Sequence, residues 1–77
     1  MATILIAEDD KAVREFVSRA LTQDGHEVTA VGDGLQALTA LEKKSYDMML
    51  ADIVMPQLDG IGLALKASKD YPGLPVL

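Results

Sequence analysis

The sequence predicts an α/β fold, a doubly wound parallel sheet, because short apolar strands alternate along it with amphipathic helices. Residues 4–7 and 48–51 are continuous apolar runs, which are typical of parallel strands buried on both faces. Each run ends at an acidic residue. We therefore expect a sheet with helices on both faces and carboxylates at one of its ends.

The elements between these runs follow from hydrophobic periodicity and turn residues. A first helix should begin after Asp10 as its N-cap and end at Gly25. Residues 26–31 alternate only partly, as an edge strand does, and His26 at its start is interpreted as a surface residue. The apolar stripe of the first helix comprises Val13, Phe16, Val17, Ala20 and Leu21.

Two further helices and the start of a fourth strand complete the predicted order. The second helix follows a turn at residues 32–34 and carries Lys43 and Lys44 near its C-terminus. The third helix ends before Pro72, and residues 74–77 begin another strand. The apolar positions that mark these two helices are Leu35, Leu38 and Leu41, then Ile61, Leu63, Ala64, Leu65 and Ala67.

Composition limits the classes of function. The 77 residues suffice for one small domain, and 49% of them are apolar, so the chain is not disordered. No apolar stretch is long enough to cross a bilayer, and the absence of cysteine excludes disulfides and thiolate metal sites. The net charge of −5 weighs against binding of nucleic acid. These features favour a cytoplasmic protein that uses neither membrane nor nucleic acid through this segment.

The acidic residues at the strand ends are the candidate site. With strand order 2-1-3, Glu8 and Asp9 after the first strand and Asp52 after the third should converge on one crevice. Neighbouring carboxylates repel one another, and Mg²⁺, which prefers oxygen ligands, would relieve that repulsion. The same cation would neutralise a phosphoryl group attacked by a carboxylate. Acidic residues at strand ends are also common as turn formers and helix caps, so the pattern alone leaves both interpretations open.

Two motifs resemble the receiver domains of bacterial response regulators: residues 4–10, Ile-Leu-Ile-Ala-Glu-Asp-Asp, and residues 52–60, which have the pattern D-x-x-M-P-x-x-D-G. The resemblance covers residues 1–77 as the amino-terminal part of one receiver domain. It implies a flavodoxin-like sheet of strand order 2-1-3-4-5, of which the first three βα units and the start of the fourth strand are present.

The resemblance also assigns roles. Asp52 becomes the phosphoacceptor and nucleophile, and the Mg²⁺ ligands become Glu8, Asp9, Asp52 and the backbone carbonyl of Val54. The loop that holds the phosphoacceptor outward would be shaped by Met55, Pro56, Asp59 and Gly60, with Asp59 interpreted first as the cap of the third helix. The phosphoryl donor would be a histidine kinase or histidine phosphotransfer protein. The protein would not be an enzyme beyond its own phosphorylation and autodephosphorylation.

Receivers also have a Ser or Thr after the fourth strand and a Lys after the fifth, and no lysine of this chain ends a strand. We therefore expect the natural protein to continue beyond Leu77. Within the family, residues 7–10 and 52–56 resemble stand-alone regulators of the CpdR type, which control substrate delivery to the ClpXP protease. That resemblance implies a protein output partner in a protease adaptor pathway.

Two other functions compete with this one. A phosphatase-like hydrolase could use Asp52 as nucleophile, but such enzymes need a second acid two residues later, where this chain has Val54. An interaction module would use the acidic residues only as helix caps, and a lack of Mg²⁺ binding would favour it.

Overall fold

The computed structural model describes residues 1–51 and 60–77 of the chain. Three strands and three helices alternate along it, as predicted. In order they are β1 (Thr3–Ala7), α1 (Lys11–Gln23), β2 (Glu27–Val31), α2 (Gly34–Lys43), β3 (Met48–Ala51) and α3 (Gly60–Asp70).

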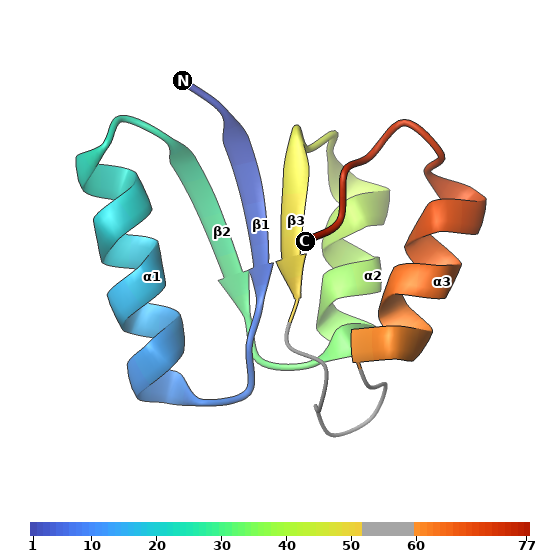
Figure 1. Ribbon diagram of the computed structural model, residues 1–77, viewed down its shortest axis with the longest axis horizontal. Coiled ribbons are helices and arrows are strands. Elements are labelled where there is room, and N and C mark those ends of the chain that lie inside the picture. Colours follow the sequence, from blue (N-terminus) through green and yellow to red (C-terminus); the bar gives the residue numbers. More distant parts are fainter. Residues whose placement is uncertain (52–59) are drawn as a thin grey trace.

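The sheet is parallel and has the predicted order β2-β1-β3. Helix α1 covers one face, and α2 and α3 cover the other (Figure 1). The segment after α3 returns to the far side of β3, where Val76 forms a parallel bridge with Met49. The Ala51 N–H donates to the Leu77 carbonyl at 3.0 Å, which confirms that a fourth strand begins beside β3.

Helix α1 begins and ends as predicted. The Asp10 Oδ1 accepts a hydrogen bond from the Val13 N–H at 3.1 Å, which caps the N-terminus. Gly25 follows the helix with φ +91°, a backbone conformation that favours glycine. The apolar stripe is less covered than its pattern suggests, because Val13 is 44% exposed and Phe16 is 74% exposed.

Helix α2 differs in detail from the prediction. Gly34 was assigned to a turn, but it is the first helical residue and is buried. Asp33 is the N-cap, and its Oδ1 accepts a hydrogen bond from the Gln36 N–H at 2.8 Å. Of the predicted apolar positions, Leu41 is buried in the core and Leu38 packs against it, whereas Leu35 is 51% exposed. Ala37 and Ala40 share the buried face.

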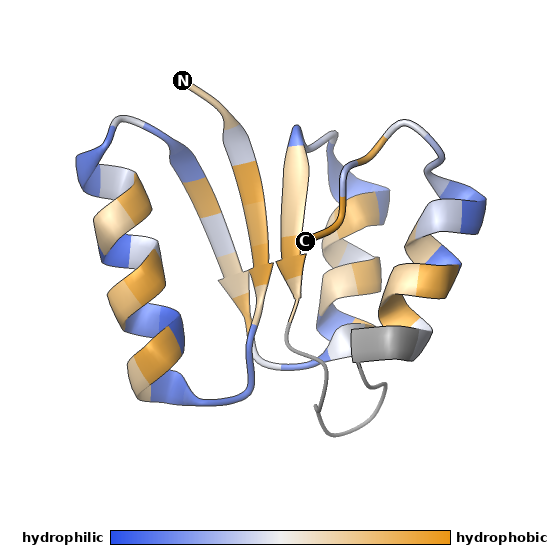
Figure 2. Cartoon of the chain, viewed as in Figure 1, coloured by the Kyte–Doolittle hydropathy of each residue, from blue (hydrophilic) through white to orange (hydrophobic). Residues whose placement is uncertain are grey.

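The hydrophobic core lies between the sheet and the pair α2 and α3. Successive side chains of a strand point to opposite faces, and Leu5 and Ala7 point to this one. Apolar residues colour the middle strand and the inner faces of these helices in Figure 2. The buried cluster comprises Leu5, Ala7, Ala37, Ala40, Leu41, Met49, Leu63 and Ala67. None of the described helices is long and apolar enough to span a membrane.

Candidate functional site

The carboxyl ends of β1 and β3 lie side by side. Ala7, the last residue of β1, pairs in register with Ala51, the last residue of β3. Glu8 and Asp9 follow Ala7 directly in the chain, and Asp52 follows Ala51. The structure therefore brings Glu8 and Asp9 to the strand end that precedes Asp52, while Asp52 itself lies outside the described residues.

The backbone of Glu8 is fixed by contacts to two other elements. Its N–H donates to the Val31 carbonyl at 3.1 Å, and its carbonyl accepts a hydrogen bond from Arg14 Nη1 at 2.8 Å. The same Arg14 nitrogen also lies close to Gly32, because a Cβ atom added to Gly32 would be 3.4 Å from it. Arg14 thus lies between the loop after β1 and the loop after β2. Sequence reasoning missed this role, although a cation one turn into α1 directly after an acidic run was a usable signal.

The three consecutive acidic residues differ in their partners. The Glu8 Oε2 accepts a hydrogen bond from the Asp10 N–H at 3.0 Å, and Asp10 caps α1. Asp9 is exposed, and its carboxylate makes no hydrogen bond or ion pair with any residue in segments 1–51 and 60–77. Glu8 and Asp9 offer hard oxygen donors at one strand end, a donor set that fits Mg²⁺.

The rest of the predicted site is not described by the structure. Gly60, grouped with the loop from the sequence, is the first residue of α3. Within segments 1–51 and 60–77, no three His, Asp or Glu side chains gather as a metal-binding group. The residues of the predicted site that lie outside the described ones are Asp52, Val54, Met55, Pro56 and Asp59.

The opposite end of the sheet is held by polar contacts that the sequence did not reveal. The Asp47 Oδ2 accepts a hydrogen bond from the Thr3 N–H at 2.7 Å, and the Asp47 N–H donates to the Thr3 carbonyl at the same distance. His26 Nδ1 accepts a hydrogen bond from the Ala2 N–H at 2.9 Å. His26 is half-buried, and this hydrogen bond ties the start of β1 to the segment before β2.

One titratable group at this end is clearly perturbed. Lys44 Nζ lies 2.8 Å from Glu27 Oε1 and 5.4 Å from the centre of the Tyr46 ring. The hydrogen bond to Glu27 raises the pKa of Lys44 above 10.5, so the ammonium form is favoured.

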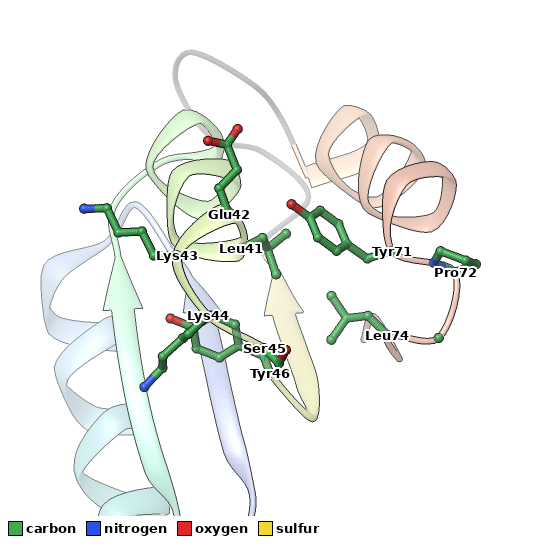
Figure 3. A pocket seen from close by; sticks show the side chains of 10 residues that line it. Leu41, Glu42, Lys43, Lys44, Ser45, Tyr46, Tyr71, Pro72 and Leu74 are labelled. Carbon is green, nitrogen blue, oxygen red and sulfur yellow. The ribbon is translucent and has the colours of Figure 1, made fainter.

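A nearby cavity of about 410 Å³ lies between the ends of α2 and α3, where Leu41, Tyr71 and Leu74 project toward one another (Figure 3). This cavity is separate from Glu8 and Asp9, which do not line it.

Comparison with known proteins decides the family. The family model described as the response regulator receiver domain matches residues 4–77. The chain belongs to the response regulator receiver family. It is 40% identical to the receiver protein CpdR of Brucella abortus over its whole length, and spans 64% of that protein. It is also 40% identical to FleR of Pseudomonas aeruginosa over 76 residues, and spans 16% of that longer protein.

Solved receiver structures share the fold. The receiver domain of a Francisella response regulator superposes with a TM-score of 0.93 at 33% identity, over 99% of this chain and 63% of that one. The response regulator TrrA of Thermotoga maritima, solved in complex with Mg²⁺-BeF, gives a TM-score of 0.93 at 28% identity, over 99% of this chain and 66% of that one. The 77-residue chain thus spans about two thirds of the length of these two solved chains.

Proposed function

We propose that this receiver accepts a phosphoryl group on Asp52, with Mg²⁺ held by Glu8, Asp9, Asp52 and the Val54 carbonyl. The observation that carries the proposal is the pairing of Ala7 with Ala51, because it sets the Glu8-Asp9 pair beside the strand that leads to Asp52. The family membership and the Mg²⁺-BeF complex of the related TrrA support it.

The residues of this chain have separate roles in the proposed reaction. A carboxylate oxygen of Asp52 attacks phosphorus, the P–N bond of the donor phosphohistidine breaks, and the leaving imidazole keeps the electron pair and takes up a proton. Bound Mg²⁺ would neutralise the negative charge on the phosphoryl oxygens. Arg14, by holding the Glu8 carbonyl at 2.8 Å, positions the adjacent acidic residues without entering the reaction.

The proposed donor is a histidine kinase or a histidine phosphotransfer protein in the cytoplasm. The histidine kinase ThkA has been solved in complex with TrrA, which in that complex matches this chain with a TM-score of 0.92. We propose that phosphorylation changes binding to a downstream protein. The 40% identity to CpdR over the whole chain supports the proposal that this downstream partner belongs to a protease adaptor pathway.

The function as a pure interaction module is less well supported. That function requires the acidic residues to serve as helix caps, and Asp10 and Asp33 do so. Asp9 caps no helix in the described part of the chain and is exposed beside the sheet end. The position of Asp9 directly after β1, beside the strand that leads to Asp52, supports a role as cation ligand instead.

The experiment is phosphorylation of the intact domain by acetyl phosphate in the presence of Mg²⁺. Borohydride reduction followed by peptide mass spectrometry should find one trapped group, on Asp52. Asp52→Ala should abolish it, whereas Asp47→Ala, which removes an acid at the other end of the sheet, should retain it. Label on His26 or on a serine would refute the assignment.

A further inference from the structure

The outer edge of β2 is the surface that the proposed function leaves unused. Among residues 1–51 and 60–77, strand β2 pairs only with β1, and β1 is paired with β3 on its other side. In the flavodoxin-like order, later strands are added beyond β3, where the Leu74–Leu77 segment already lies. In that strand order, no later strand pairs with the outer edge of β2.

Two residues supply the free backbone groups of this edge. Glu27 and Val31 direct their backbone toward β1, since the Glu27 N–H donates to the Ala2 carbonyl and the Val31 carbonyl accepts from Glu8. The alternation of a parallel ladder then directs the N–H and C=O of Val28 and Ala30 outward. The flanking N–H groups are used, His26 by the Leu21 carbonyl and Gly32 by the Gln36 side chain.

A groove runs between this edge and α2. It has a volume of about 620 Å³ and is floored by Thr29 and Val31 of β2. Leu35 lines the groove and is 51% exposed, so it adds apolar surface that a partner could cover. The α2 wall is completed by Gln36, Thr39, Ala40 and Lys43.

The groove carries opposite charges at its two ends. Lys43 and Lys44 lie at the end nearest Glu27, and Asp33 lies just after Val31 at the other end. Lys43 has no hydrogen bond or ion pair with the described residues, so its ammonium group is available to a partner.

We propose that this edge and groove form a contact between two copies of this chain, with their β2 strands antiparallel about a two-fold axis at Thr29. This arrangement pairs Val28 of each copy with Ala30 of the other, so their outward groups form four backbone hydrogen bonds. It also turns the basic end of one groove toward the acidic end of the other. An isologous contact requires such self-complementarity, and the charge order of the groove provides it.

Sedimentation equilibrium of the protein and two charge variants tests the proposal. Lys43→Glu should weaken dimerisation about tenfold, because two symmetric attractions become repulsions. Lys69→Glu is the matched control, since it makes the same charge change in the last turn of α3 and does not line the groove. Ala30→Pro removes one outward N–H from each copy and should weaken dimerisation further, with the circular dichroism spectrum checking the fold.

A disulfide tests the register, because the chain has no cysteine of its own. Facing Thr29 residues would have Cα atoms about 4.5 Å apart, within the range that a disulfide spans. Thr29→Cys should therefore oxidise to a covalent dimer at least tenfold faster than Thr22→Cys on exposed α1. A monomer at every concentration, equal cross-linking of the two variants, or a dimer that Lys43→Glu leaves unchanged would overturn the proposal.

Discussion

Asp9 and Asp10 are adjacent aspartates that differ in their hydrogen-bond partners and therefore in their roles. Asp10 accepts the Val13 N–H and caps α1, whereas Asp9 is exposed and has no partner among the described residues. The cap could be predicted because Asp10 directly precedes an apolar helical stripe. The contact of Asp47 with Thr3 could not be predicted, because it joins a side chain to a backbone group 44 residues away, and backbone groups leave no side-chain pattern.

The two aspartates provide a matched test of the proposed Mg²⁺ site. Mg²⁺ at about ten times its dissociation constant should stabilise the intact domain by about 1.4 kcal/mol, or several degrees in melting temperature. Asp9→Asn should lose most of that gain. Asp10→Asn should keep it, since asparagine also caps helices. Equal responses of the two variants in thermal melts with and without Mg²⁺ would exclude Asp9 as a ligand.

A pH effect is expected at Lys44. Because Glu27 raises the pKa of Lys44 in the folded state, the stabilisation is fully present below 10.5 and is lost as pH rises through the folded value. The group is exposed, so the effect is small. Lys44→Gln should lower the melting temperature at pH 8 and make no difference well above the folded pKa. Lys43→Gln, which removes a neighbouring lysine without a described partner, is the control for the loss of one positive charge.

The helices show how far an element can be predicted from its own residues. Helix α1 has a cap and a glycine stop at the expected places. Helix α2 begins earlier than expected, because Asp33 caps it and Gly34 is its first residue, where the sequence indicated a turn. Leucine spacing marked the helix and found Leu41 of its buried face, but it overlooked Ala37 and Ala40, which are buried beside it.

Gly25 is the most sensitive position at an element boundary. Its φ of +91° is unfavourable for residues with a Cβ, so Gly25→Ala should destabilise the fold by about 1–2 kcal/mol in urea unfolding. No neighbouring atom lies within 4 Å of its Cβ position, so the cost is conformational and not steric. Gly73→Ala is the control, because Gly73 also has open space and lacks a positive φ. A loss of similar size at Gly73 would contradict this explanation.

At the scale of the whole molecule, the order β2-β1-β3 followed from the alternation of strands and helices, and the position of Glu8 and Asp9 followed from that order. The distribution of the hydrophobic core over the two faces of the sheet did not follow from the order of the elements. Both faces of β1 are buried, yet the largest buried cluster lies on the side of α2 and α3, and no residue of α1 is buried. Sequence periodicity assigns each helix an apolar face but does not say how much of it a neighbour covers.

This unequal packing predicts where the fold is most sensitive to truncation of a side chain. Leu63 is completely buried in the cluster and Leu65, two residues later on α3, is 69% exposed. Leu63→Ala should cost about 2–5 kcal/mol, because it removes apolar contacts and leaves a cavity that α2 and β3 cannot fill without moving. That loss is a large part of the total free energy of unfolding of so small a domain.

Leu65→Ala is the control and should change the free energy of unfolding by about 0.5 kcal/mol or less. Urea unfolding of both variants, followed by circular dichroism, measures the difference, and equal losses would show that the core does not lie between α3 and the sheet.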